Sequence, residues 1–261
     1  MRIILVTGAS SGLGAEFVRR LDRLSIIEGW EIDEIWGIAR SGDKLAALQK
    51  ELHTPFRPLA LDLTQEASFH LVKAMLHSLH PEVWMVVNAA GMGKIGGPGE
   101  ISDQDTARMI DLNCKAAVEM TSAVLPYIPR GGRIVEICST ASFQPFPYLN
   151  VYAASKAFLY RYSRALSREL RGRGISVTAV CPYWVKDTGF IGNARQGDGG
   201  DKIRGFPFAS EEKTVVRKAV QDVLMRKPVS TPGPVCTVHR AAAKLLPDGF
   251  MMDLWELIRW L

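Results

Sequence analysis

Short runs of apolar, often β-branched residues alternate along the chain with longer stretches in which apolar residues recur every three or four positions. The first pattern predicts buried strands, and the second predicts amphipathic helices. Strands are expected at residues 3–6, 35–39, 57–61, 83–88, 133–139 and 176–181. Helices are expected at residues 12–24, 43–53, 66–79, 103–126, 152–171, 213–226, 238–246 and 250–260.

The alternation of these elements predicts an α/β fold. Continuous apolar strands separated by helices form a parallel sheet that is covered on both faces. We therefore expect residues 1–261 to form a single doubly wound Rossmann-type domain. Its parallel sheet should have six or seven strands in the order 3-2-1-4-5-6, with right-handed crossovers.

The pattern changes in the last third of the chain. Residues 187–213 are rich in glycine and polar residues, and long loops in compact domains are often disordered or functional. We interpret this segment as a mobile lid over a substrate site. Residues 238–261 should add C-terminal helices, and their apolar tail could join a subunit interface, cover the pocket or rest on a membrane surface.

Composition narrows the classes of protein that fit. With 47% hydrophobic and 23% charged residues among 261, the chain is neither disordered nor collagen-like. The net charge is only +5, and the basic residues are scattered, whereas a nucleic-acid-binding protein more often carries a basic stripe. No apolar stretch approaches the roughly 20 residues of a membrane-spanning helix.

The cysteines show neither a metal-binding nor a disulfide pattern. They stand at wide spacings with no C-x-x-C pair, at Cys114, Cys138, Cys181 and Cys236. Cys138 and Cys181 lie within apolar runs, as reduced core residues do. We therefore expect no metal site and a reducing compartment, which points to a cytoplasmic location.

The first strand leads directly into a glycine-rich turn, after which a helix is expected. Such a turn lets backbone N–H groups approach a pyrophosphate at the helix N-terminus. The spacing is G-x-x-x-G-x-G, and the alternative is an ordinary turn whose glycines provide φ > 0. The candidate cofactor-binding residues here are Gly8, Ser10, Ser11, Gly12, Leu13 and Gly14.

The residue at the end of the second strand indicates which dinucleotide binds. A site that prefers NAD places a carboxylate there for the ribose 2′-hydroxyl, but this chain has Arg40. Because an arginine can bind a 2′-phosphate through charge-assisted hydrogen bonds, we expect NADP(H). Asp62, which is followed by Leu63, could accept a hydrogen bond from the adenine amino group or belong to a helix N-cap region.

Small residues follow the fourth strand, where open α/β sheets bind ligands at the carboxyl ends of their strands. The candidate cofactor-binding residues at this strand end are Asn88, Ala89, Ala90 and Gly91.

A tyrosine and a lysine one helical turn apart form the most specific local feature. Residues i and i+4 share one face of a helix, so Lys156 should hold its ammonium group near the Tyr152 hydroxyl. A nearby positive charge favours tyrosinate and should lower the tyrosine pKa, which suits a general acid/base for a carbonyl/alcohol pair. Ser139, at the end of the fifth strand, could bind the substrate oxygen.

Together these features resemble the short-chain dehydrogenase/reductases in their shorter, single-domain branch. The resemblance covers about residues 2–188 and rests on motifs in the expected order: Thr7-Gly8-(x)3-Gly12-x-Gly14, Asn88-Ala89-Ala90-Gly91, Asn113, Ser139 and Tyr152-(x)3-Lys156.

The resemblance implies a role for each catalytic residue. Tyr152 would donate the proton during reduction, and Ser139 would orient and polarise the carbonyl. Lys156 would also bind the nicotinamide ribose, and the backbone of Asn113 would hold a water molecule in the proton relay.

After the sixth strand, the resemblance places Pro182, Val185 and Thr188 in the loop that lines the nicotinamide, with the Val185 backbone at the carboxamide. This chain departs from the family there, because Tyr183 replaces the usual glycine and Asp187 precedes the threonine.

We expect an oxidoreductase that interconverts a ketone or aldehyde and an alcohol. One alternative is an epimerase or dehydratase of the longer family branch, but that branch carries a G-x-x-G-x-x-G turn that this chain lacks. Another is a non-catalytic NADP-binding regulator, which would be expected to lose the tyrosine, lysine or serine.

Apolar residues near the expected pocket suggest a bulky, apolar substrate such as a steroid, a lipid or an aromatic ketone, although several of them could simply pack the core. These residues are Phe143, Pro145, Phe146, Pro147, Leu149, Tyr183 and Trp184.

The family also usually forms homodimers or homotetramers through its two long helices, here 103–126 and 152–171. Surplus apolar residues on the second helix, namely Phe158, Leu159 and Tyr162, agree with such an interface.

Overall fold

A computed structural model of the chain describes residues 1–260. One seven-stranded sheet forms its centre, in the order β3-β2-β1-β4-β5-β6-β9, and all of the neighbouring strands are parallel. This arrangement confirms the predicted α/β fold and strand order. The strands are β1 (Arg2–Thr7), β2 (Glu34–Ala39), β3 (Phe56–Ala60), β4 (Glu82–Asn88), β5 (Arg133–Ile137), β6 (Ser176–Val180) and β9 (Val229–Ser230).

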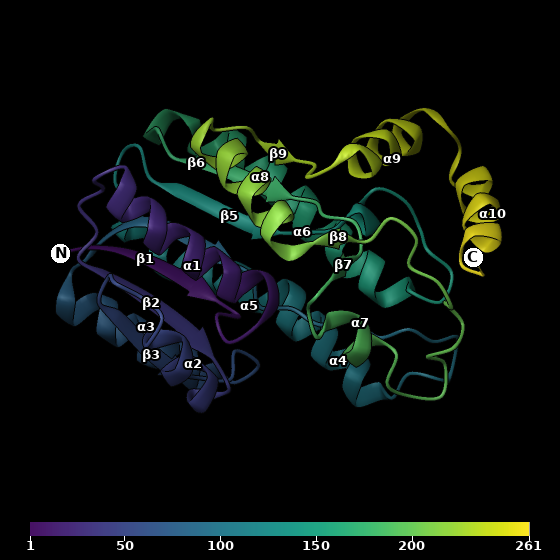
Figure 1. Cartoon of the computed structure of the whole chain (residues 1–261), viewed down its shortest axis with the longest axis horizontal. Helices are drawn as coiled ribbons and strands as arrows, with labels where there is room; N and C mark the ends of the chain where they lie inside the picture. The colour runs from purple at the N-terminus through teal and green to yellow at the C-terminus, as the bar shows by residue number, and fades with distance from the viewer. Residues whose placement is uncertain (261) are drawn as a thin grey trace.

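Helices cover both faces of the sheet (Figure 1). One face carries α1 (Gly12–Ile27), α2 (Gly42–Gln49) and α8 (Glu212–Leu224), and the other carries α3 (Glu66–Leu79), α5 (Ala116–Val124) and α6 (Asn150–Glu169). The remaining helices are α4 (Asp103–Ile110), α7 (Phe190–Ala194), α9 (Pro234–Leu245) and α10 (Asp248–Ile258).

Two apolar clusters explain why the strands read as continuous hydrophobic runs. Ile4 and Val6 of β1 belong to the cluster beneath α1 and α8, whereas Ile3 and Leu5 belong to the cluster beneath α3 and α5. Successive side chains of a strand point to opposite faces. A strand that is covered on both faces therefore needs apolar residues at every position.

The predicted helix at 103–126 is helical throughout, but it is not one regular α-helix. A π-helical turn at Asp111–Lys115 separates α4 from α5. Within this turn the buried Asn113 side chain accepts a hydrogen bond from the Met92 N–H at 2.9 Å and donates to the Met92 carbonyl at 2.8 Å. These long-range bonds leave no trace in hydrophobic periodicity, which explains why the sequence predicted a single helix.

Residues 187–213 are partly ordered by local structure. The segment contains α7, and its strand β8 (Ser210–Glu211) pairs with β7 (Val185–Lys186). In Figure 1, α7 lies beside α4 at the end of the molecule where the central strands terminate. This end of the sheet is also where α/β folds bind their ligands.

The C-terminal helices α9 and α10 extend along the same end of the molecule (Figure 1). Trp255 of α10 is buried, and its indole N–H donates to the Pro147 carbonyl at 3.1 Å. No helix within residues 1–260 is both long enough and apolar enough to cross a membrane.

Candidate active site

A cavity of about 530 Å³ opens at the carboxyl ends of the central strands. Most residues that the sequence analysis assigned to the cofactor line this cavity. They come from the turns after β1, β2, β3, β4 and β6, so the strand order brings distant sequence segments together. The lining set includes Gly8, Ser10, Ser11, Gly12, Leu13, Gly14, Arg40, Asp62, Leu63, Ala89, Ala90, Gly91, Pro182, Val185 and Thr188.

The turn after β1 requires glycine at two positions. Gly8 has a φ of 68°, and a Cβ atom there would lie 2.8 Å from the Ala90 nitrogen. A Cβ atom on Gly14 would lie 2.2 Å from the Gly8 carbonyl oxygen. Because only glycine fits both positions, the backbone packs closely where the turn enters α1, and such a turn fits the pyrophosphate of a dinucleotide.

A hydroxyl group joins this turn to the end of β4. Thr7 Oγ1 accepts hydrogen bonds from the N–H groups of Ala89 and Ala90, both at 3.1 Å. These bonds hold the small residues after β4 against the glycine-rich turn.

Cationic side chains surround the cavity near the end of β2. Arg40 is exposed, and it lines the cavity together with Lys44 of α2. No carboxylate follows β2 at this point, since Arg40 is followed by Ser41. Two cations, with no carboxylate at the residue directly after the strand, fit the 2′-phosphate of NADP(H).

Asp62 supports the turn after β3 while it lines the same cavity. Its carboxylate accepts hydrogen bonds from the Thr64 N–H at 3.0 Å and from Arg108 at 3.2 Å. Burial raises the pKa of Asp62, but the hydrogen bonds from Thr64 and the charges of Arg108 and Arg40 outweigh that effect and lower it overall. Asp62 is therefore an ionised acceptor at neutral pH, as a contact to an adenine amino group requires.

Asn88 is placed differently from its neighbours, because it does not line the cavity. Its amide nitrogen donates to Glu136 Oε1 and Thr121 Oγ1, both at 2.9 Å. Glu136 is fully buried in β5, and this burial raises its pKa to about 8. The Asn88 side chain thus joins β4, β5 and α5 behind the cavity.

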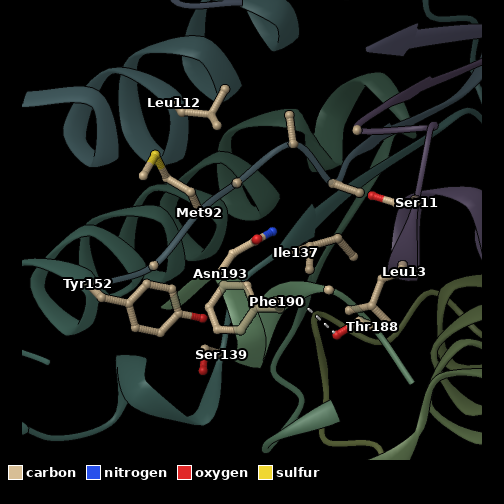
Figure 2. Close-up of a pocket in the computed structure, with 18 of the residues that line it drawn as sticks. Ser11, Leu13, Met92, Leu112, Ile137, Ser139, Tyr152, Thr188, Phe190 and Asn193 are labelled. Atoms are coloured by element: carbon tan, nitrogen blue, oxygen red, sulfur yellow. Dashed lines mark hydrogen bonds between the residues drawn. The ribbon is translucent and has the colours of Figure 1, made fainter. Parts of the chain in front are cut away.

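Ser139, Tyr152 and Lys156 meet at one place in the cavity wall. Ser139 precedes a 3-10 turn, Thr140–Ser142, and the other two residues lie one helical turn apart on α6. Figure 2 shows the Tyr152 hydroxyl pointing toward Ser139. The Lys156 ammonium lies 5.9 Å from the centre of the Tyr152 ring and donates to the Ile137 carbonyl at 2.8 Å.

The expected lowering of the tyrosine pKa by Lys156 is wrong for this arrangement of protein groups. Burial raises the pKa of Tyr152 to about 12, against a smaller lowering by a hydrogen bond with Ser139. The Lys156 ammonium is directed to a backbone carbonyl, and burial lowers its own pKa. Tyr152 is therefore protonated at neutral pH, which suits a proton donor.

Asn113 lies behind the catalytic residues rather than in the cavity wall. Its amide donates to Ser155 Oγ at 2.9 Å, in addition to its two bonds with Met92. Ser155 precedes Lys156 on α6, so Asn113 ties the π-helical turn to the helix that carries the catalytic pair. The family assigns its water-binding role to the backbone at this position.

The predicted apolar residues divide into two groups. Phe146, Leu149, Tyr183 and Trp184 line the cavity, whereas Phe143, Pro145 and Pro147 do not. Phe143 instead packs edge-on against Tyr160, with ring centres 5.5 Å apart. The C-terminal helix supports the lining group, because the Trp255 ring lies 5.0 Å from that of Phe146. The tail therefore packs behind the apolar wall of the pocket, at Phe146.

Sequence reasoning missed several lining residues. Lys44 and Arg108 come from helices, and Phe190 and Asn193 come from α7 within the glycine-rich segment. An exposed helical lysine or arginine carries no signal of its own. The run of glycines after Gly91 was a usable signal, since close backbone approach is a common reason for glycine.

All four cysteines are free and buried. Within residues 1–260, no group of three or more histidine, cysteine, aspartate or glutamate side chains is arranged to hold a metal ion.

Comparison with known proteins gives the same family over most of the chain. Residues 2–199 match the family model described as short chain dehydrogenase. A serine 3-dehydrogenase from Agrobacterium fabrum is 33% identical over 181 residues, which are 69% of this chain and 70% of that protein.

Solved structures extend the similarity to nearly the whole chain. A short-chain dehydrogenase from Sphingobium yanoikuyae in complex with NADPH has 30% identity and a TM-score of 0.79, and the match covers 97% of this chain and 95% of the other. A bulky-bulky ketone specific alcohol dehydrogenase from Comamonas testosteroni has 25% identity and a TM-score of 0.74, with 96% and 94% covered. The matched motifs, fold and overall similarity agree, and the chain belongs to the short-chain dehydrogenase/reductase family.

Proposed function

We propose that this enzyme transfers hydride between NADP(H) and a ketone/alcohol pair whose carbonyl carbon carries a bulky, uncharged, apolar group. The apolar wall next to Tyr152 carries the proposal: Phe146, Leu149, Trp184 and Phe190 all line the cavity there. Apolar and aromatic walls with a few positioned polar groups are typical of sites for small molecules. Steroid, lipid and aromatic ketones have this chemistry.

In the proposed site, the turn residues from Gly8 to Gly14 and the small residues after β4 hold the dinucleotide backbone. Arg40 holds the 2′-phosphate and Asp62 the adenine. Lys156 binds the nicotinamide ribose, while the 182–188 loop lines the nicotinamide. When bound, NADPH supplies the hydride.

The protein's part in the chemistry is to stabilise charge and to supply a proton. Negative charge develops on the carbonyl oxygen during hydride transfer, and the Ser139 and Tyr152 hydroxyls are placed to donate hydrogen bonds to it. Tyr152 then gives up its proton to form the alcohol. In the proposed relay, Lys156 and a water held by the backbone at Asn113 return a proton to Tyr152.

Charge in the substrate part of the cavity favours an uncharged substrate. Lys94, in the loop after β4, is a cationic residue of the cavity lining. Its ammonium donates to the Gln196 carbonyl at 3.1 Å and lies 3.5 Å from an Asp105 carboxylate oxygen. A lysine that is already paired attracts a substrate carboxylate weakly.

A 3-hydroxy acid is the second candidate substrate. The relative from Agrobacterium fabrum is named for serine, which carries a carboxylate. Lys94 lines the cavity, and it would serve as the carboxylate partner if it exchanged Asp105 for the substrate.

A turnover screen of the purified protein tests the proposal. We expect faster NADPH oxidation with aryl and alicyclic ketones than NADP⁺ reduction with L-serine or 3-hydroxybutyrate. The reverse preference would support the second candidate. Tight NADPH binding without turnover of any carbonyl or alcohol would instead indicate a non-catalytic regulator.

A further inference from the structure

Helix α7 rests on the glycine-rich stretch 91–99, directly over the catalytic residues. The Ile95 N–H donates to the Ala194 carbonyl at 2.8 Å, which joins this stretch to the end of α7. A Cβ atom on Gly199 would lie 2.4 Å from the Gly96 Cα atom. The two segments therefore approach at backbone distance, and glycine makes that approach possible.

The aromatic ring of Phe190 lies in this contact, against Gly93 and Tyr152. A Cβ atom on Gly93 would lie 2.7 Å from Phe190 Cζ and 3.0 Å from Tyr152 Cδ2. The rings of Phe190 and Tyr152 have their centres 5.4 Å apart. Figure 2 shows the Phe190 ring beside the Tyr152 hydroxyl, with Asn193 pointing from the same helix into the cavity.

The backbone that carries Phe190 is anchored at the cofactor side of the cavity. Thr188 Oγ1 donates to the Val185 carbonyl at 3.1 Å and accepts from the Phe190 N–H at 3.4 Å. A Cβ atom on Gly12 would lie 3.3 Å from the Thr188 side chain. The Phe190 backbone is thus held through Thr188 beside the glycine-rich turn, and the Phe190 ring is held by its contact with Gly93.

We propose that Phe190 is a specificity-determining residue, whose ring limits the size of one of the two groups on the substrate's carbonyl carbon. The inference rests on the proposed function. A carbonyl oxygen that is hydrogen-bonded to Tyr152 and Ser139 places its carbon within van der Waals reach of a ring that packs on Tyr152. Gly93 contributes by leaving room for that ring.

Removing the Phe190 ring should allow a larger group on one side of the substrate's carbonyl carbon, and it should leave the size limit on the other side unchanged. We compare Phe190→Ala with the parent, using NADPH and two ketones, acetophenone and benzophenone. Discrimination by an apolar pocket changes roughly ten- to two-hundredfold when its volume changes by a small group. The ratio of kcat/KM for benzophenone to that for acetophenone should therefore rise by about tenfold or more.

Phe208→Ala is the matched control, because it removes a phenyl ring from the same segment at a residue that is 80% exposed and does not line the cavity. It should leave the ratio unchanged. The Kd for NADPH should stay within about twofold of the parent in both variants.

An unchanged kcat/KM ratio in Phe190→Ala, with turnover intact, would overturn this inference but not the proposed function. Absence of turnover of any ketone by the parent would overturn the proposed function, and the inference with it.

A double-mutant cycle tests whether Gly93 seats the ring. Gly93→Ala should lower both the melting temperature and kcat/KM for acetophenone, because its methyl group would collide with Phe190. Adding Phe190→Ala should restore most of the melting temperature, since contacting residues couple. Additive losses in the double variant would show that the ring does not sit on Gly93, and would also overturn the inference.

Discussion

At the scale of single residues, burial sets the protonation states on which the site depends. The Tyr152 side chain is buried, and this raises its pKa to about 12. Burial lowers the pKa of Lys156, which lies on the same helix face. The sequence predicted the pairing of these residues from their spacing, but not their burial or the backbone carbonyl that binds the lysine. Both depend on residues far away in the chain.

Tyr152→Phe should abolish most turnover, because it removes the proton donor but keeps the ring and its packing. Loss of a positioned acid typically lowers the rate about 10²–10⁴-fold. NADPH affinity and melting temperature should stay close to those of the parent. Tyr160→Phe, on the same helix but outside the cavity lining, is the control. A folded Tyr152→Phe variant with nearly parental kcat would contradict the assignment.

Arg40→Ala should weaken NADPH binding about tenfold or more, since charge-assisted hydrogen bonds to a phosphate are among the stronger ones. NADH lacks the 2′-phosphate, so its Kd should change little. Arg23→Ala, another exposed arginine, should affect neither cofactor. Titration by fluorescence measures the six dissociation constants of the parent and the two variants. Equal losses of affinity for NADPH and NADH in Arg40→Ala would contradict the role of Arg40.

Glu136 should make the folded protein less stable as pH rises. Its pKa is about 8 in the folded chain because of burial, and an unfolded glutamate has a pKa of about 4.3. Between these values only the folded state holds the proton. The stabilisation is complete below the unfolded pKa, falls by about 1.4 kcal/mol per pH unit as pH rises, and is lost above the folded pKa.

Glu136→Gln tests this dependence, because the amide keeps the shape of the neutral acid but does not ionise. The melting temperature of the parent should fall relative to that of the variant between pH 5 and pH 8. Parallel curves for the two proteins would mean that Glu136 does not titrate in this range.

At the scale of helices and strands, the sequence predicted those elements whose pattern is set by the sheet. The strands β1, β2, β4, β5 and β6 were found because burial on both faces makes them largely apolar. The edge strand β3 is only partly buried and carries Arg57 and Pro58. The strand β9 (Val229–Ser230) pairs over only two residues in a proline-rich stretch, so it left no such pattern. The π-helical turn at Asp111–Lys115 was also missed, because tertiary hydrogen bonds of Asn113 accompany it.

The junction between β1 and α1 should be intolerant of any side chain at Gly14. A Cβ atom there would lie 2.2 Å from the Gly8 carbonyl, and overpacking of this kind typically costs about 1–3 kcal/mol. Gly14→Ala should lower the melting temperature by several degrees and weaken NADPH binding at least tenfold. Gly172→Ala, where a Cβ meets nothing within 4 Å, should do neither. A Gly14→Ala variant with parental NADPH affinity would contradict the close approach.

At the scale of the whole molecule, the doubly wound strand order brings every turn of the site to the carboxyl end of the sheet. The C-terminal helices lie at the same end, where Trp255 packs against Phe146 of the cavity wall. The family model ends at residue 199, so this support lies in the part of the chain outside the matched region. The family motifs therefore include the residues that we propose for the cofactor, but they do not reach the C-terminal support of the residues that we propose for the substrate.

The exposed apolar surface of α6 leads to a prediction about assembly. Leu159, expected there as a surplus apolar residue, is instead buried in the core. Phe158 is 50% exposed and stacks on Tyr162 with a ring distance of 6.5 Å. Ile110 of α4 is also exposed, and α4 packs against α6. An apolar surface on the helices through which the family usually associates favours a homodimer or homotetramer.

Sedimentation velocity at micromolar concentration should therefore show a species larger than the monomer of 28.8 kDa. Phe158→Asp should shift the equilibrium toward the monomer, because an unpaired carboxylate would be desolvated in the interface. Phe208→Asp places the same charge at a phenylalanine that is 80% exposed and remote in sequence from both interface helices, so it should leave the assembly intact. A monomeric parent would rule out the assembly. An oligomer that tolerates Phe158→Asp would place the contact on another surface, of which the exposed leucines of α9 and α10, Leu245, Leu254 and Leu257, are the next to test.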